Sequence, residues 1–151
     1  MVDEPIAHVH EPLPASIAAD VFRRRARALV GQSLTGVVGL VSDRGWEPDW
    51  ALGFSFELSG IAAYTLRDDD WCFAEAPELI RAKPIEAEYA WTDVAPLLGL
   101  DGLVGQPLRG ASLRWRAAVP EPLAEFVLGF PGTEVILFNG GDELSVRIAQ
   151  P

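Results

Sequence analysis

Histidine, cysteine and lysine are nearly absent from this chain of 151 residues, and their scarcity excludes most common catalytic sites. The two histidines are His8 and His10, the single cysteine is Cys72 and the single lysine is Lys83. Hydrolases, transferases and metalloenzymes commonly depend on these side chains as bases, nucleophiles or ligands. Because both histidines precede the first predicted helix, we expect no Ser-His-Asp triad, Cys-His pair or two-histidine metal site inside the fold.

Sequence motifs for cofactors are also missing. The chain has no glycine-rich phosphate loop with a lysine, no Gly-x-Gly-x-x-Gly and no Gly-x-Ser-x-Gly. His8-Val9-His10-Glu11 offers two imidazoles and a carboxylate, but a loose arm gives a metal ion no rigid surroundings. The acidic run 68–70 lacks the spacing of a calcium loop. We expect no metal and no cofactor, and an enzyme, which would need carboxylates, arginine or tyrosine, is disfavoured.

Basic residues are outnumbered by acidic ones, 12 to 22, which gives a formal net charge of -10. Nucleic-acid binding needs a basic surface, so this balance argues against a nucleic-acid partner and favours a basic protein. The alternative is that the charge only keeps the protein soluble and monomeric.

Long apolar runs are absent too. The longest, near Leu34 to Val41, is far short of the ~20 residues that span a bilayer, and the acidic N-terminus does not resemble a secretory signal. A lone cysteine agrees with a reducing compartment. We therefore expect no membrane partner and a cytoplasmic location. The excess of arginine over lysine indicates a GC-rich bacterial genome.

The length and the 49% hydrophobic content predict a single domain over 1–151. A loose arm begins the chain and an amphipathic helix is predicted from about Pro14 to Val30, so that arm and helix together cover 1–30. Arg25 projects into the apolar arc of this helix. We expect its guanidinium to be a buried structural charge with a carboxylate or carbonyl partner.

An internal repeat is the most specific signal in the chain. Leu29-Val30-Gly31-Gln32-Ser33-Leu34-Thr35-Gly36 returns as Leu103-Val104-Gly105-Gln106-Pro107-Leu108-Arg109-Gly110, with six of eight positions identical. The tripeptide Leu-Gly-Phe also occurs twice downstream, as Leu52-Gly53-Phe54 and as Leu128-Gly129-Phe130, and is predicted to match between the two copies. The predicted copies cover about 29–75 and 103–149. Between them, 76–100 carries helix signals at Glu78 to Lys83 and from Thr92-Asp93 to Gly99.

Alternation of apolar and polar residues within each copy is typical of half-buried strands. Trp50, Leu52, Phe54, Phe56 and Leu58 are expected on one face, and each copy should form a meander of about four strands. The predicted fold class is mainly β (α+β). Two duplicated antiparallel meanders form a sandwich or a barrel, with an N-terminal helix and short linker helices.

Candidate partner-binding residues are aromatic and acidic side chains in predicted turns: Trp46, Glu47, Asp49, Asp68, Asp69 and Asp70. Trp50 is expected in the core because it continues the apolar face of its strand.

The composition favours a non-catalytic binding protein that covers a basic protein partner, as an immunity protein or antitoxin covers its toxin. Two alternatives remain open. One is a small-molecule binder with an apolar pocket lined by Trp71, Phe73, Trp115 and Phe126. The other is an enzyme that uses paired carboxylates. The oligomeric state is left open.

Overall fold

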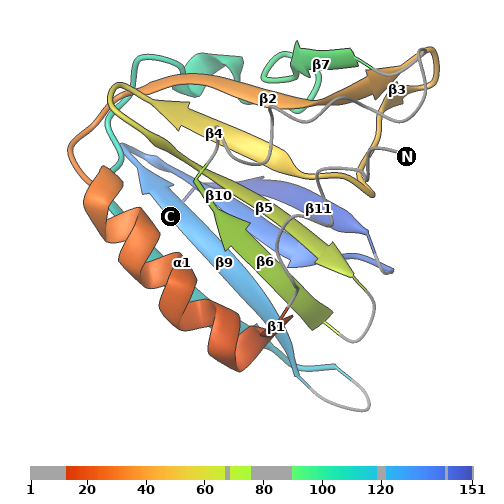
Figure 1. Cartoon of the computed structure of the whole chain (residues 1–151). Coiled ribbons are helices and arrows are strands. Elements are labelled where there is room, and N and C mark those ends of the chain that lie inside the picture. The colour runs from red at the N-terminus through yellow and green to blue at the C-terminus, as the bar shows by residue number, and fades with distance from the viewer. Residues whose placement is uncertain (1–12, 67–68, 76–89, 119–121, 142, 151) are drawn as a thin grey trace, which may run out of the picture.

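The computed structural model describes residues 13–66, 69–75, 90–118, 122–141 and 143–150, and these form two antiparallel sheets beside one α-helix (Figure 1). The first sheet has the strand order β1-β6-β5-β4-β2-β3, and β7 also pairs with β2. Its strands are β1 (Leu13–Pro14), β2 (Leu34–Ser42), β3 (Gly45–Trp46), β4 (Leu52–Phe56), β5 (Gly60–Leu66), β6 (Asp70–Ala74) and β7 (Ala90–Asp93). The second sheet has the order β11-β10-β9-β8. Its strands are β8 (Gly110–Arg116), β9 (Leu123–Phe130), β10 (Thr133–Asn139) and β11 (Leu144–Ala149).

The predicted fold class is confirmed: the protein is mainly β with an N-terminal helix. Each sheet contains a four-strand meander, β2-β4-β5-β6 in the first and β8-β9-β10-β11 in the second. The core lies between the sheets and the helix, where apolar side chains of all three pack together. Burying these side chains is the main force that holds the layers together.

Helix α1 (Ala15–Leu29) matches the predicted helix to within one residue at each end. Its buried face consists mostly of alanines with Phe22 at the centre, so the backbone can approach the sheets closely. The helix packs against β6 of the first sheet and β8 and β9 of the second. The Phe22 ring contacts Phe73 and Phe126, with centroids 5.1 and 5.0 Å apart.

The two Leu-Val-Gly-Gln segments form matching type II turns. Val30 has φ −59 and ψ 130, Val104 has φ −62 and ψ 127, and the glycine that follows each has φ 92. A type II turn needs a residue with positive φ at its third position, and glycine supplies it. The fourth residue of each turn closes it by donating to the first, at 3.0 Å in one turn and 2.9 Å in the other.

These turns also bind each other through reciprocal hydrogen bonds. The N–H of Gly31 donates to the carbonyl of Leu108 at 2.8 Å, and the N–H of Gly105 donates to the carbonyl of Leu34 at 2.7 Å. The Leu34 and Leu108 amides in turn donate to the glutamine carbonyls of the opposite turn. The repeated octapeptide therefore joins the two halves of the molecule through an approximate two-fold arrangement.

The same arrangement extends along the strands. Thr65 and Asn139, which are 74 positions apart, are joined by a hydrogen bond of 3.0 Å. Phe56 and Phe130, with the same separation, stack with centroids 6.3 Å apart. The sequence predicts that Phe54 matches Phe130, and this match is wrong by two residues. Ser55 pairs with Gly36 and Gly129 pairs with Gly110, so Ser55 corresponds to Gly129. The duplication itself stays a prediction, which these registers support.

The segment predicted as a helical linker contains a strand. Thr92 and Asp93 lie in β7, and Asp93 accepts a hydrogen bond from the Ala95 amide at 3.1 Å. A single helical turn follows and ends at Gly99, whose φ is 72. The helix expected at 78–83 lies outside the described residues. None of the helices in the described parts of the chain has the length and apolar character needed to cross a membrane.

Candidate functional site

Loops from both sheets meet at one end of the molecule, on the right of Figure 1. The β3–β4 loop contacts the β10–β11 turn, because the Leu144 amide donates to the Pro48 carbonyl at 3.3 Å. The β5–β6 turn joins them through Thr65, whose hydroxyl donates to the Asp70 carbonyl at 2.8 Å and accepts from Asn139. We call this region the acidic end; the acids of these three loops that reach the surface are Glu47, Asp49, Asp70 and Glu143, while Asp43 and Arg44 lie in the β2–β3 turn.

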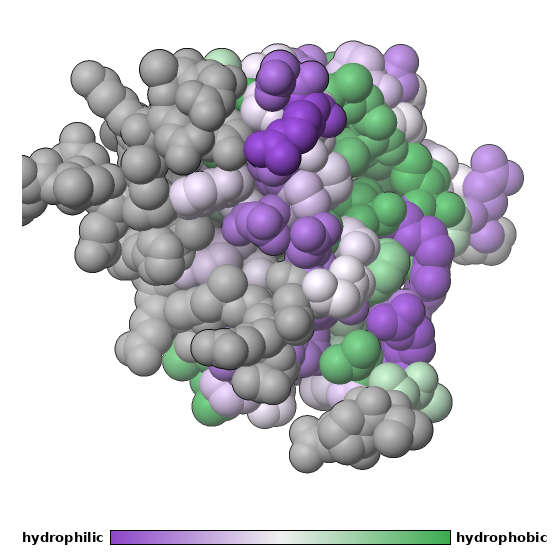
Figure 2. Space-filling view, turned by 90° about the vertical axis from the view of Figure 1, so that its right-hand side faces the viewer, coloured by the Kyte–Doolittle hydropathy of each residue, from purple (hydrophilic) through white to green (hydrophobic). Residues whose placement is uncertain are grey.

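Figure 2 views the molecule from this side and shows strongly hydrophilic residues beside apolar ones. Asp43, Asp49 and Glu143 are exposed, whereas Glu47 and Asp70 are half-buried. The sequence predicted Glu47, Asp49 and Asp70 as candidates. It did not identify Glu143, because only the contact between the two sheets brings Glu143 close to the β3–β4 loop.

Glu47 is held in place by its own hairpin. Its carboxylate accepts a hydrogen bond of 2.6 Å from the Ser42 hydroxyl, and its amide donates to the Leu40 carbonyl at 2.9 Å. Trp46 beside it is half-buried and packs against the core. Its indole Nε1 is buried and has no hydrogen-bond partner among the described residues. A side chain at Gly39 would begin only 2.9 Å from this nitrogen, so the close approach of the ring requires glycine there.

Asp69 has a structural place that the sequence did not predict. It is 8% exposed and its φ is 55. One carboxylate oxygen accepts the Trp71 indole N–H at 2.7 Å, and the other accepts the Ala124 amide at 2.9 Å. Both acceptor oxygens are therefore engaged inside the fold, and Asp69 is not a surface charge. Its neighbour Asp68 lies outside the described residues.

Trp50 and Leu58 depart from the face predicted for β4. Leu52 and Phe54 do lie in the core between the sheets. Trp50 is only partly buried and packs against a separate small cluster that contains Tyr64, and Leu58 is exposed. The strand begins after Trp50 and ends before Leu58, so alternation does not extend to either residue.

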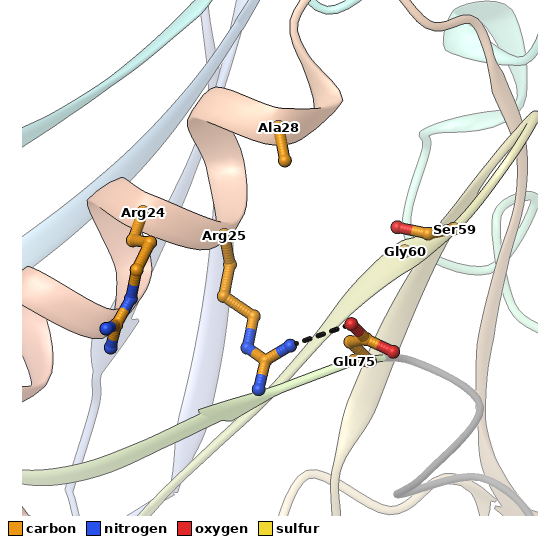
Figure 3. A pocket seen from close by; sticks show the side chains of 6 residues that line it. All are labelled: Arg24, Arg25, Ala28, Ser59, Gly60 and Glu75. Carbon is orange, nitrogen blue, oxygen red and sulfur yellow. Dashed lines mark ion pairs between the residues drawn. The ribbon is translucent and has the colours of Figure 1, made fainter.

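Arg25 lies at the edge of the core. Its side chain is 31% exposed, and its guanidinium lies 3.1 Å from a carboxylate oxygen of Glu75 (Figure 3). The partner is a carboxylate, as expected, but the pair lies at the rim of a pocket of about 210 Å³ and not deep in the core. This pocket lies between α1 and the β4–β5 hairpin. Its lining residues are Arg24, Arg25, Ala28, Ser59, Gly60 and Glu75.

The rings expected to line an apolar pocket fill the core. Trp71, Phe73 and Phe126 are buried and contact one another, with centroids 4.7 to 5.6 Å apart. Trp115 is exposed on the edge strand β8. The four rings therefore do not surround a common cavity.

Tyr64 is a buried titratable group whose pKa is raised. Burial raises the pKa of its phenol far above the ordinary value, and the neighbouring Cys72 thiol raises it further. The two residues face each other across β5 and β6 within a small apolar cluster. Among the described residues, no group of three His, Cys, Asp or Glu side chains is placed to hold a metal ion.

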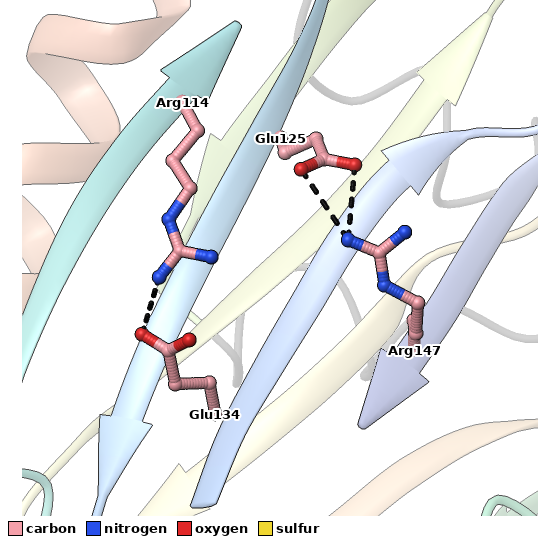
Figure 4. Close-up of polar contacts among 4 residues, drawn as sticks. All are labelled: Arg114, Glu125, Glu134 and Arg147. Carbon is pink, nitrogen blue, oxygen red and sulfur yellow. Dashed lines mark hydrogen bonds and ion pairs between the residues drawn. The ribbon is translucent and has the colours of Figure 1, made fainter. Parts of the chain in front are cut away.

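The outward face of the second sheet carries a network that the sequence prediction missed (Figure 4). Arg114 pairs with Glu134 at 2.5 Å, and Arg147 pairs with Glu125 at 3.2 Å. Alternation in 111–117 places Arg114 and Arg116 on one face of β8. Only the strand register shows which acids lie opposite them.

Comparison of the chain with protein-family models, curated proteins and solved structures found no match.

Proposed function

We propose that this protein is a non-catalytic binding protein whose acidic end covers a basic surface of a protein partner, as an immunity protein or antitoxin covers its toxin. The observation that carries the proposal is the meeting of loops from both sheets at one end. They bring Glu47 and Asp49 close to Glu143, and Asp70 lies at the end of the adjoining β5–β6 turn. These acids are separated by up to a hundred positions in the chain.

The charge of the whole molecule works in the same direction as the acidic end. A net charge of -10 attracts a basic partner over a distance, and the local cluster orients it at close range. At 0.15 M salt the Debye length is about 8 Å, so the local cluster then contributes most of the remaining attraction.

The acidic end is also held in a defined shape. Glu47 is fixed by Ser42, and the two loops are joined through Leu144 and Pro48. A surface that is already ordered loses less conformational entropy on binding. Trp46, half-buried in the same hairpin, adds an aromatic ring that can anchor the centre of an interface.

The test begins with capture of basic proteins from the native host and continues with binding kinetics of the purified pair. We expect the double variant Asp49→Asn with Glu143→Gln to lower the association rate constant by about threefold to tenfold at 50 mM salt, with a smaller effect at 300 mM. Both side chains are exposed and neither makes a described ion pair, so the variant should fold normally. Asp69 is left intact because its carboxylate is structural.

The matched control is Asp20→Asn with Asp101→Asn, which removes the same charge from exposed positions on α1 and at the 3-10 turn 101–103. We expect it to slow association less than twofold. Equal effects of the two double variants would show that only net charge matters and that the acidic end is not the binding surface. Recovery of no basic partner would overturn the proposal as a whole.

A further inference from the structure

The outward face of the second sheet presents positive charge on a protein whose net charge is -10. The strand register places Arg114, Glu125 and Phe138 side by side across β8, β9 and β10. Glu134 and Arg147 lie on the same face, opposite Gly129 and Ile136. We call this surface the arginine face; it consists of Arg114, Arg116, Glu125, Glu134, Phe138 and Arg147.

Two of its three arginines have carboxylate partners, and the third has none among the described residues. Glu125, 7% exposed, receives the Arg147 guanidinium at 3.2 and 3.4 Å. The Glu134 carboxylate accepts a hydrogen bond from the Arg114 guanidinium at 2.5 Å. Arg116 makes no ion pair with a described residue; its guanidinium carbon lies 5.1 Å from the centre of the Phe138 ring. The face therefore carries one positive charge more than it neutralises.

The Phe138 ring lies beneath the guanidinium of Arg116. The Arg147 guanidinium also lies over its ring, at 5.7 Å, so that two cations contact one aromatic side chain. Stacking on an aromatic ring orients a guanidinium while leaving its N–H donors available. Arginine donors in this state match a carboxylate, which can accept two parallel hydrogen bonds.

The equivalent face of the first sheet is built differently. By the 74-position relation, Arg114 corresponds to Leu40 and Phe138 to Tyr64, and both counterparts are buried. The Arg114 and Arg147 side chains are instead 45% and 47% exposed. The outward face of the first sheet is thus buried at these two positions, whereas the arginine face presents arginines to solvent.

We infer that the arginine face docks an acidic segment of a partner protein, with a carboxylate on Arg116 and an apolar or aromatic side chain beside Phe138. Charge complementarity selects this occupant. A nucleic acid is disfavoured because three arginines beside two glutamates neutralise few phosphates. The inference does not depend on the acidic end and stands whether or not a basic partner is found.

The test is an NMR titration of the ¹⁵N-labelled chain with the capped peptide Glu-Glu-Trp-Glu-Glu at 150 mM NaCl, where remote charges are screened. We expect saturable shifts of backbone amides in β8 to β11, and no comparable shifts with the matched peptide Gln-Gln-Trp-Gln-Gln. Arg116→Ala should weaken binding at least about threefold. Arg116→Lys should restore only part of it, since lysine keeps the charge but lacks the planar guanidinium.

The control variant is Arg23→Ala, which removes a positive charge from the exposed face of α1. It should change the affinity less than 1.5-fold. Arg147 is not used, because its loss would leave Glu125 unpaired. Arg116→Gln, which retains most of the side-chain stem, repeats the test if the alanine variant does not fold. Shifts confined to other strands, equal losses in the Arg23 and Arg116 variants, equal binding of both peptides, or tighter binding of a DNA duplex to this face would each overturn the inference.

Discussion

Replacing Asp69 by alanine should destabilise the fold strongly, although the residue lies in an acidic turn. Its carboxylate accepts the Trp71 indole N–H at 2.7 Å and the Ala124 amide at 2.9 Å, and the latter bond ties the β5–β6 turn to β9. Trp71 and Ala124 are both buried, so water cannot replace the lost acceptor. Leaving a buried donor unsatisfied costs about 1–3 kcal/mol, and two such donors give an expected loss of about 3–4 kcal/mol.

Urea unfolding followed by tryptophan fluorescence measures this loss, because Trp71 reports directly on the core. Asp69→Asn should lose less, about 1–2 kcal/mol, since its carbonyl oxygen can still accept one of the two bonds and asparagine tolerates positive φ. Asp43→Ala, in an exposed turn, is the control and should change the free energy of unfolding by less than about 0.5 kcal/mol. An Asp69→Ala variant as stable as the control would refute the structural role.

Gly31→Ala and Gly105→Ala should each destabilise by about 1 kcal/mol and by similar amounts in urea unfolding, because both glycines have φ 92 in matching turns; unequal losses would contradict their equivalence. Absorbance at 295 nm should show no ionisation of Tyr64 in the folded protein up to pH 11, since burial raises its pKa. The free energy of unfolding should then fall above pH 10, where the unfolded chain begins to release this proton, and early ionisation of the folded protein would contradict this. Arg25→Ala should cost less than about 1 kcal/mol in the same unfolding assay, because its ion pair is exposed to solvent; a loss of 3 kcal/mol would show that the charge is buried.

Local patterns in the sequence predicted the local structure well. The amphipathic period located α1 to within one residue at each end, because a helix with one apolar arc must bury that arc. The repeated octapeptide predicted two equivalent turns, since glycine after valine allows the positive φ. It did not predict that Gly31 and Gly105 would donate across to the other turn, because one chain gives no information on which segments meet.

The candidate site was predicted only in part, for the same reason. Glu47 and Asp49 were identified from their loop, but Glu143 joins them through a contact between the sheets. The sequence predicts Asp69 as a surface residue, because its burial depends on Ala124, 55 positions away. The helical wheel predicted the direction in which Arg25 points. It could not predict that the core ends close to this side chain, so that the guanidinium pairs with Glu75 at the edge of the core.

Hydrogen exchange of the protein with and without its basic partner tests the acidic end most directly. The account predicts slower exchange on binding for amides in 43–50 and 139–145, which form the loops joined through Leu144 and Pro48. Amides in the paired turns at 29–34 and 103–108, at the other end of the molecule in Figure 1, should exchange at an unchanged rate. Protection of the paired turns or of α1, with no change in 43–50 and 139–145, would contradict the claim that the acidic end is the binding surface.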